Sequence, residues 1–345
     1  MITSAILGCG NISRVHLNAM ASVPQAKLRL LYDPKRERAE AAAAMFGGRV
    51  ADSAEEILQS REIDAVHILS PHVFHAGQVK AALEHGKHVL CEKPMAASVQ
   101  SALELVRMDA YGERLCVIFQ NRYNPSSVRA KEIIESGELG RIVTLKAQMT
   151  WRRGAEYYSD DWHGKLALEC GGVLINQCIH TIDLMMWLGG RARRVKGGIS
   201  TDLLQGVIEV EDNAHAVIEY EAGHIGLLYA SNNYGVDEVP EIKIALEKAT
   251  LVHAGDDLFQ IDNATGERKL IASREADSGI QGKAMYGFSH PHQIREFYSD
   301  IINGRPHTIS AAEAYPAVWA VSSIYESARE NRWVDFQQLC VNGKI

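Results

Sequence analysis

The first 120 residues of the chain alternate short apolar runs with longer helix-like segments, and this alternation constrains the fold more than any other feature. The apolar runs lie at 5–7, 28–32, 65–69, 89–91 and 115–119. Short buried strands that alternate with helices of ten or more residues are typical of a parallel sheet covered on both faces. We therefore expect residues 1–120 to form one α/β domain.

The pattern changes after about Asn121. Longer segments that alternate apolar and polar residues lie at 142–150, 194–199, 214–220, 225–230 and 241–246. This period of two indicates strands of a sheet with one exposed face. Two helices are expected near the end of the chain, at about 291–303 and 311–331. We therefore expect residues 121–345 to form a second, α+β domain.

Length and composition exclude several classes of protein. The chain has 345 residues, of which 46% are hydrophobic and 23% charged, and its net charge is −7. These values suit two globular domains and argue against a nucleic-acid-binding surface. No apolar stretch approaches the roughly 20 residues that span a bilayer, and the N-terminus lacks the layout of a secretion signal. The six cysteines show no Cys-x-x-Cys spacing, so we expect a cytoplasmic protein with reduced thiols.

A glycine-rich turn joins the first apolar run to the first helix. It has the form G-x-G-x-x-S and ends at Ser13, where many such turns carry Gly or Ala. Gly8 allows a tight turn, and Gly10 lets the backbone approach a pyrophosphate at the helix N-terminus. We expect Gly8, Gly10, Asn11 and Ile12 to bind a dinucleotide, and the domain to be of the Rossmann type.

Asp33 ends the second apolar run, 20 residues after Ser13. An acidic residue at this place accepts a hydrogen bond from the 2′-hydroxyl of a ribose, which favours NAD over NADP. Arg36 and Arg38 follow closely and keep NADP as an alternative, because they would attract a 2′-phosphate. The predicted cofactor is NAD.

Two further strand ends carry polar residues. Ser70, Pro71 and His72 follow the third apolar run, and Glu92 and Lys93 follow the fourth, just before a proline. In a doubly wound sheet, the carboxyl ends of the strands face the ligand crevice. We therefore expect these residues at the cofactor site, with Lys93 near the nicotinamide.

A segment far downstream supplies a candidate base. Residues 171–183 begin with two glycines and are predicted to form a helix, which places Asn176, His180 and Asp183 on one face at i, i+4 and i+7. A histidine has a pKa suited to proton transfer near neutral pH. Asn176 lies one turn before His180 and is expected to orient it.

Two alternatives involve metal. Cys170, Cys178 and His180 are zinc-ligand types close together in the sequence, and His290 and His292 flank a proline at an expected helix start. The first set could form a zinc site, and a His-x-His pair can chelate metal in a strand. Beside a proline, however, this pair is more typical of a substrate contact or of exposed residues, and we predict no metal.

Candidate substrate residues lie between the two motifs. They mix aromatic rings with hydrogen-bond donors, as sugar-binding sites do, and comprise Arg122, Arg153, Tyr157, Trp162 and His163. The alternative is a solvated polar loop without a binding role. Asn176 is also a candidate contact for the substrate.

The glycine turn, Glu92-Lys93-Pro94 and the segment from Gly171 to Asp183, in this order and spacing, resemble the glucose–fructose oxidoreductase/inositol 2-dehydrogenase (Gfo/Idh/MocA) family. The likeness covers almost the whole chain, including the helix around His75, which we add to the expected cofactor site. The resemblance implies a Rossmann domain and a second domain built on a large, mostly antiparallel open sheet. It also implies a homo-dimer or homo-tetramer joined through that sheet.

The same resemblance implies NAD(P)-linked oxidation or reduction of sugars and polyols. Lys93 and His180 match the family's catalytic lysine and histidine, while Asn176 stands where many members carry aspartate. We expect His180 to act as general acid/base, Lys93 to stabilise the developing alkoxide, and Asn176 to position the reacting groups. Two alternatives are a glycoside hydrolase that keeps NAD bound and oxidises its sugar transiently, and a non-catalytic nucleotide-binding sensor. A sensor needs neither Lys93 nor His180.

Overall fold

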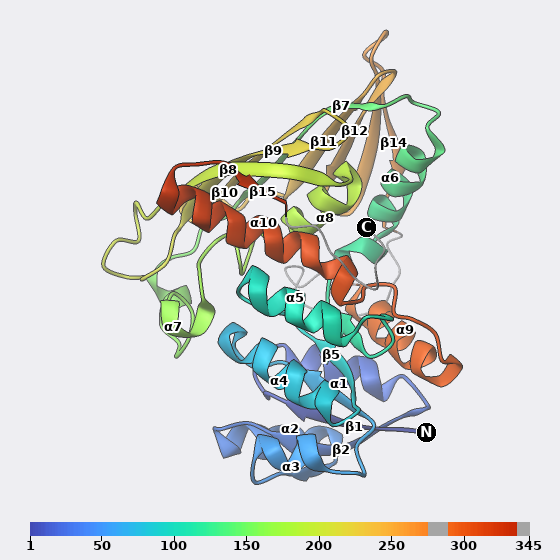
Figure 1. Cartoon of the computed structure of the whole chain (residues 1–345), viewed down its shortest axis with the longest axis vertical. Coiled ribbons are helices and arrows are strands. Elements are labelled where there is room, and N and C mark those ends of the chain that lie inside the picture. The colour runs from blue at the N-terminus through green and yellow to red at the C-terminus, as the bar shows by residue number, and fades with distance from the viewer. Residues whose placement is uncertain (275–288, 337–345) are drawn as a thin grey trace. The chain divides into compact units, whose positions relative to one another are not determined.

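A computed structural model of the chain describes residues 1–274 and 289–336 (Figure 1). The described residues divide into two compact units. Unit 1 comprises 1–120 and 289–315, and unit 2 comprises 121–274 and 316–336. The first boundary coincides with the expected domain division. The return of 289–315 to unit 1 differs from the expected continuous second domain, 121–345.

Unit 1 contains a six-stranded sheet in which all neighbouring strands are parallel. In their order across the sheet, the strands are β3 (Arg49–Val50), β2 (Ala26–Tyr32), β1 (Ile2–Leu7), β4 (Ala65–Ile68), β5 (His88–Cys91) and β6 (Leu115–Val117). This order, 3-2-1-4-5-6, is that of the dinucleotide-binding Rossmann fold. It confirms the predicted fold class and brings the ends of β1, β4 and β5 side by side.

The helices of unit 1 are α1 (Ser13–Ala21), α2 (Arg36–Phe46), α3 (Ala54–Gln59), α4 (His72–Glu84), α5 (Val99–Met108) and α9 (His290–Asn303). Two begin at serine caps that the sequence indicates. Ser53 accepts a hydrogen bond from the backbone N–H of Glu56 at 3.1 Å, and Ser98 accepts one from that of Ser101 at 3.2 Å. Such caps satisfy amide groups that the first turn of a helix leaves without partners.

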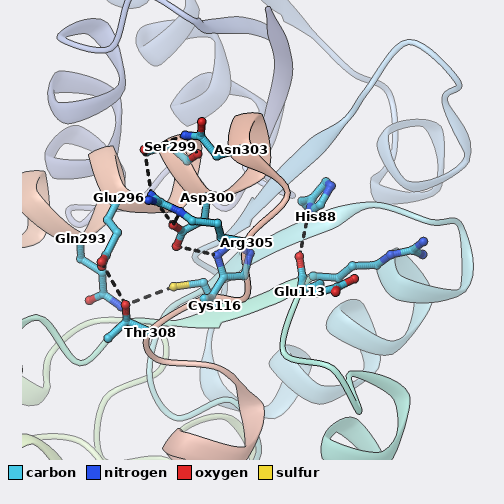
Figure 2. A network of polar contacts seen from close by, with 12 residues as sticks. His88, Glu113, Cys116, Gln293, Glu296, Ser299, Asp300, Asn303, Arg305 and Thr308 are labelled. Carbon is cyan, nitrogen blue, oxygen red and sulfur yellow. Dashed lines mark hydrogen bonds and ion pairs between the residues drawn. The ribbon is translucent and has the colours of Figure 1, made fainter.

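Helix α9 belongs to unit 1 because its side chains complete the core of the parallel-sheet domain. Ile294, Phe297 and Tyr298 are fully buried in one cluster with residues of β1 and α1. Gln293 donates to the carbonyl oxygen of Val117 in β6 at 2.7 Å and also contacts Cys116 (Figure 2). These contacts join segments far apart in the sequence and leave no periodic signal in it. For this reason, the sequence pattern alone did not predict that residues 289–315 belong to unit 1.

The turn after α9 closes on the helix itself. Arg305 donates to the carboxylate of Asp300 at 2.9 Å, and the hydroxyl of Thr308 donates to Glu296 at 2.9 Å (Figure 2). Beyond this turn, Ser310 forms a bridge with Cys116 of β6. The polypeptide therefore stays attached to the parallel sheet until α10 (Ala311–Glu330) begins.

Unit 2 contains a nine-stranded sheet, antiparallel except for the parallel pair of β7 and β10. Across the sheet the strands are β14 (Arg268–Ala272), β13 (Asp257–Asp262), β12 (Ala249–Ala254), β11 (Glu241–Leu246), β7 (Ile142–Thr150), β10 (Ile225–Ser231), β9 (Asn213–Tyr220), β8 (Ala192–Ser200) and β15 (Val334–Asp335). The large, mostly antiparallel sheet is confirmed. Strands β12 to β15 were not predicted, because their apolar residues do not alternate as regularly.

The helical elements of unit 2 are η1 (Gln120–Tyr123), α6 (Pro125–Ser136), η2 (Ala155–Tyr158), α7 (Leu166–Glu169), α8 (Ile179–Gly189) and the part of α10 from Pro316 on. Helix α8 packs on β7 and β11, and α6 packs on β12 and β13. The side chains of Ile225, Leu227 and Tyr229 alternate with buried residues of β10 and are 42–50% exposed. Within residues 1–274 and 289–336, no helix is both long and apolar enough for a membrane span.

Candidate active site

The glycine turn after β1 has the shape that a bound dinucleotide requires. Gly8 has a φ of +97°, and a Cβ atom added to it would lie 2.6 Å from the carbonyl oxygen of Leu69, so only glycine fits there. Around Gly10, by contrast, a Cβ atom would meet nothing within 4 Å. Asn11 is exposed and Ile12 partly so, directly before α1. The turn therefore combines a tight backbone with open space at the helix N-terminus, as a pyrophosphate site needs.

Asp33 lies next to this turn. Its carboxylate accepts hydrogen bonds from the backbone N–H of Cys9 at 2.8 Å and from that of Lys35 at 2.9 Å. The side chain is thereby held rigidly between the end of β2 and the glycine turn. Burial, assisted by the charge of Asp33, raises the pKa of the Cys9 thiol to about 12. Each carboxylate oxygen can accept a further bond, so the placement suits the predicted contact with a ribose hydroxyl.

His75 joins the loops that follow β4 and β5. Its Nε2 lies 2.6 Å from the carbonyl oxygen of Ser70, and its Nδ1 lies 2.8 Å from that of Pro94. Both nitrogens of this fully buried ring are therefore used inside unit 1. The family resemblance implies that His75 lies at the cofactor itself, whereas these contacts suit a supporting role. Pro71 directly precedes α4, and His72, the first residue of this helix, is also buried.

Glu92 is a buried carboxylate held by two histidines. Its Oε1 lies 3.1 Å from Nε2 of His16 in α1 and 3.3 Å from Nε2 of His290 in α9. Its Oε2 accepts from the backbone N–H of Lys93 at 3.3 Å. Burial opposes ionisation of Glu92, but the bonds from His16 and His290 outweigh it and hold the pKa of the carboxyl well below its usual range. Glu92 thus anchors the peptide of Lys93.

The partners of Glu92 continue into a buried chain of hydrogen bonds. An ionised carboxylate only accepts, so His16 donates from Nε2, and burial lowers its pKa and keeps Nδ1 able to accept. Nδ1 of His67 lies 3.0 Å from Nδ1 of His16, and its Nε2 lies 2.9 Å from the hydroxyl of Tyr298. The hydroxyl of Tyr298 in turn donates to that of Ser4 at 2.9 Å. A buried chain of polar groups therefore connects Glu92 to Ser4 in β1.

The sequence predicts Glu92 at the cofactor, but the structure gives its carboxylate other partners. Its exposed fraction is 7%, and its carboxylate belongs to the buried network beside the strand end. The side chain of Lys93 is partly exposed, and a cis peptide bond follows it. The two neighbouring residues therefore have different roles. Glu92 holds the backbone at Lys93, while the side chain of Lys93 stays partly accessible. His16, His67 and Tyr298 were not predicted, because they carry no local signal in the sequence.

Among the residues that the structure describes, one set of three histidine or carboxylate ligand atoms lies mutually within 4.8 Å: His16, Glu92 and His290. Their distances are those of ordinary hydrogen bonds, and the network needs no ion to satisfy the carboxylate. The triplet considered for zinc in the sequence, Cys170, Cys178 and His180, does not come together in this way. Cys178 is completely buried, and burial raises the pKa of its thiol.

In unit 2, the segment 171–178 is not the regular helix that the sequence predicts. Residues 173–178 form successive turns, and α8 begins only at Ile179. A buried carboxylate holds the segment instead: Glu211 accepts from the backbone N–H of Gly172 at 2.8 Å and from that of Leu174 at 3.0 Å. A Cβ atom on Gly172 would lie 1.9 Å from the backbone oxygen of Glu211, so the close approach requires glycine.

Asp183, one turn after the partly exposed His180, forms a buried ion pair. Its carboxylate accepts from Nε of Arg122 at 2.9 Å and from Nη2 at 2.7 Å. The guanidinium also lies 5.5 Å from the ring of Trp187. Arg122, expected at the substrate, thus uses two nitrogens to hold α8 against η1. Its role as a substrate contact stays a prediction.

The remaining candidate substrate residues form one continuous group within unit 2. The guanidinium of Arg153 lies 5.5 Å from the ring of Tyr157, and the ring of His163 lies 4.7 Å from that of Tyr157 and 4.0 Å from that of Trp162. The hydroxyl of Tyr157 accepts from Gln177 at 3.2 Å. The structure therefore brings Arg153, Tyr157, Trp162 and His163 to the residue that follows Asn176.

Two buried polar residues of this group were missed in the sequence. Asn232 donates to Oε1 of Gln177 at 2.9 Å and to the hydroxyl of Tyr158 at 3.1 Å. Glu169, at the end of α7, accepts from the side chain of Asn176 at 2.5 Å. Gln177, the partner of Asn232, directly follows the candidate residue Asn176. This neighbour was the one sequence signal that pointed to the group. Of the two expected catalytic side chains, Lys93 belongs to unit 1 and His180 to unit 2.

Comparison with known proteins agrees with this arrangement. Residues 2–119 match the family model described as an oxidoreductase family with an NAD-binding Rossmann fold, and residues 127–252 match the GFO/IDH/MocA C-terminal domain. Together the two models span most of the chain. The first match covers the glycine turn, Asp33 and Lys93, and the second covers His180.

Curated relatives include the levoglucosan dehydrogenase of Pseudarthrobacter phenanthrenivorans, 24% identical over 97% of this chain and 98% of that protein. The NAD⁺-dependent scyllo-inositol 2-dehydrogenase of Bacillus subtilis is 29% identical over 70% of this chain and 71% of its own length.

Solved structures with the same fold include two dehydrogenase complexes. The WlbA dehydrogenase of Bordetella pertussis, in complex with NADH and UDP-GlcNAcA, has a TM-score of 0.83 at 27% identity and covers 98% of this chain and 99% of that chain. Levoglucosan dehydrogenase, in complex with NADH and levoglucosan, has a TM-score of 0.86 at 22% identity, and the match covers 98% of this chain and 100% of that chain. The chain therefore belongs to the GFO/IDH/MocA oxidoreductase family and is an NAD-dependent dehydrogenase whose unit 1 is the Rossmann domain.

Proposed function

We propose that this enzyme transfers a hydride between NAD and a secondary alcohol carbon of a sugar, a cyclic polyol or a sugar derivative. The observation that carries the proposal is the anchoring of Lys93 at the end of β5 by the buried carboxylate of Glu92, within the NAD-binding domain. The substrate class is supported by relatives that are named for levoglucosan and scyllo-inositol. Both are compact rings that carry several hydroxyl groups.

The residues divide the chemistry as follows. When bound, NAD⁺ supplies the acceptor for the hydride. His180 takes the proton of the alcohol oxygen as general base, and returns it in the reverse direction. The ammonium of Lys93 stabilises the negative charge that develops on this oxygen. Lys93 and His180 must act on the same oxygen, so the proposal requires units 1 and 2 to bring both to one substrate. The overall change is alcohol plus NAD⁺ to ketone, NADH and a proton.

A single assay tests the proposal. Polyols, aldoses and sugar lactones are offered with NAD or NADP (both redox states), and the nicotinamide absorbance is followed. We expect net reduction or oxidation with at least one member of the panel, and loss of this signal in the Lys93→Ala variant. Sugar cleavage with no net NADH would instead identify the NAD-retaining glycoside hydrolase. Tight NAD binding without any turnover would identify the sensor.

The same assay tests Asp33. Its fixed carboxylate accepts a ribose hydroxyl but repels a 2′-phosphate, so kcat/KM with NAD should exceed that with NADP by about tenfold or more. The Asp33→Ser variant should narrow this ratio, since the repulsion is removed. A tenfold preference of the wild-type enzyme for NADP would show that the interpretation of Asp33 is wrong.

We also propose that the enzyme is a homo-oligomer joined through the exposed face of the unit 2 sheet. Ile225, Leu227 and Tyr229 present a row of large apolar side chains on β10, and such rows favour burial against a second copy. The molar mass measured by light scattering during size-exclusion chromatography should be that of a dimer or tetramer. The paired change Leu227→Glu and Tyr229→Glu should dissociate it, and a wild-type monomer at micromolar concentration would refute the proposal.

We further propose that the protein is cytoplasmic, where its cysteines would stay reduced.

A further inference from the structure

We propose that His290 is a positioning residue of the active site: it holds the backbone of Lys93 in place by donating a hydrogen bond to Glu92. The inference rests on the proposed function, because it takes Lys93 to stabilise the developing alkoxide. His290 itself is not expected to touch the substrate or the cofactor, because it is buried and its Nε2 contacts Glu92. Its influence on the reaction passes through the carboxylate of Glu92.

The two oxygens of the Glu92 carboxylate have different partners. Oε1 lies 3.1 Å from Nε2 of His16 and 3.3 Å from Nε2 of His290. Oε2 accepts from the backbone N–H of Lys93 at 3.3 Å. Because Oε1 is held by donors from two helices, the carboxylate cannot rotate freely, and Oε2 stays directed toward the backbone of Lys93. The peptide of Lys93 is thereby held at the end of β5.

His290 is the donor that comes from the distant helix α9. It begins this helix, which packs on α1 and β5, and its exposed fraction is 2%. Its Nδ1 is buried and has no hydrogen-bond partner among the described residues. An ionised carboxylate only accepts, so the proton that faces Glu92 is on Nε2. His16 donates to the same oxygen, but it also contacts His67. A change of His290 therefore tests the bond to Glu92 with less disturbance of the buried chain.

The same two donors keep Glu92 ionised. Burial raises the pKa of this carboxyl, but the bonds from His16 and His290 outweigh burial and hold the pKa well below its usual range. Without the donor at position 290, burial is opposed by fewer bonds, so the pKa of Glu92 must rise. An ionised carboxylate accepts the N–H of Lys93 more strongly than a protonated one. The anchor of Lys93 is therefore complete above the pKa of Glu92 and weakens as the pH falls through it.

Other titratable groups also lie near Glu92. Besides the two histidines, its charge acts on His75 of α4 and Cys91 of β5, and Lys93 follows it in the sequence. Burial lowers the pKa of His75 and raises that of Cys91, which favours the uncharged form of each near neutral pH. A new pH dependence that a change of His290 creates is therefore assigned to Glu92 rather than to these two neighbours.

His290→Met and His290→Gln form a matched pair, because the two new side chains have similar size and only Gln carries a donor near the place of Nε2. The rate is measured for the reduction, by NADH, of the ketone that forms from the most active polyol of the panel. In this direction His180 gives a proton, so its own titration does not slow the reaction in acid. We expect kcat of His290→Met to lie within about threefold of the wild type at about pH 8, but at least about tenfold below it at about pH 6. His290→Gln should follow the wild type within about threefold at both pH values, and the Kd for NADH should change in neither variant.

His307 offers a matched control within the same unit. It is 4% exposed, its Nδ1 lies 3.3 Å from the carboxylate of Asp300, and its Nε2 is buried without a hydrogen-bond partner in the described part of the chain. Asp300 binds Arg305 in the turn after α9 (Figure 2), and none of these three is a candidate site residue. His307→Met should lower the melting temperature about as much as His290→Met, but its kcat should keep the pH dependence of the wild type. All rates are referred to active sites titrated with NADH.

A purely structural role for His290 gives a different pattern. His290→Met would then behave like His307→Met, with a lower melting temperature and an unchanged ratio of the two kcat values. Equal losses in His290→Met and His290→Gln would show that the donor to Glu92 is not what matters. Both results contradict the inference and leave the proposed function intact. Should His290→Met fail to fold, His290→Asn takes its place, because its shorter amide does not reach the place of Nε2. A wild-type enzyme that oxidises no polyol and reduces no ketone would instead mean that the proposed function itself has failed.

Discussion

Replacing Lys93 with alanine should lower kcat by about a hundredfold or more, while the Kd for NAD changes by less than about threefold. The ammonium is the one charge that the proposal places at the developing alkoxide, and an electrostatic contact of this kind has its largest effect in the transition state. We expect NAD binding to depend on other parts of unit 1, mainly the glycine turn and Asp33. The change should therefore separate chemistry from cofactor affinity.

Lys80→Ala is the control for this variant. Lys80 lies on α4 of the same unit and pairs with Glu104 at the surface, where both side chains are about half exposed. Its removal deletes an equal charge and an equal length of side chain, and kcat should stay within about twofold of the wild type. Measurements of kcat, of KM and of NADH binding by fluorescence suffice. If Lys93→Ala turns over as fast as Lys80→Ala, Lys93 is not catalytic.

Asp183→Asn should lower the free energy of unfolding by about 3–5 kcal/mol, the range found when one partner of a buried ion pair is removed. The side chains of Asp183 and Arg122 are 1% and 6% exposed. The amide keeps the shape of the carboxylate but cannot balance the guanidinium charge or accept both of its bonds. Since Asp183 lies in α8 together with His180, the substitution should also loosen the candidate base, and activity should fall with stability.

Urea denaturation followed by circular dichroism measures the effect. Glu132→Ala is a suitable control, because it breaks an ion pair between Arg129 and Glu132 in which both side chains are more than half exposed. Pairs of this kind contribute little, and the control should change the unfolding free energy by less than about 0.5 kcal/mol. A loss below about 1 kcal/mol in Asp183→Asn would mean that the Arg122 charge is compensated by other groups.

The local features of the cofactor domain could be predicted well from the sequence. Gly8 and Gly10 lie where the turn needs them, Asp33 ends its strand beside that turn, and Ser53 and Ser98 cap the helices that they precede. Each of these is marked by residue types within a few positions of one another, so the short-range pattern predicts it, although the contact of Asp33 with the backbone N–H of Cys9 spans 24 positions. The family resemblance extended this prediction to the large sheet of unit 2.

Predictions for the surroundings of the catalytic candidates were weaker. The sequence predicts a regular helix from 171, but the buried carboxylate of Glu211 holds Gly172 and Leu174 in turns, and α8 starts at Ile179. The face that grouped Asn176 with His180 therefore does not exist as a helical face. Hydrophobic periodicity cannot reveal such a buried acceptor, which lies 39 residues away from Gly172 in the chain.

The sequence alone determined the class of fold, the place of the dinucleotide turn and the identity of the candidates Lys93 and His180, since periodicity, turn residues and short motifs are properties of neighbouring residues. Their surroundings, in contrast, depend on how the chain folds in space. Glu92 meets His16 across 76 positions, Tyr298 meets Ser4 across 294, and Asp183 meets Arg122 across 61. Such pairs depend on the strand order and on the packing of α9 in unit 1, because a buried polar group binds to the segment that the fold places next to it.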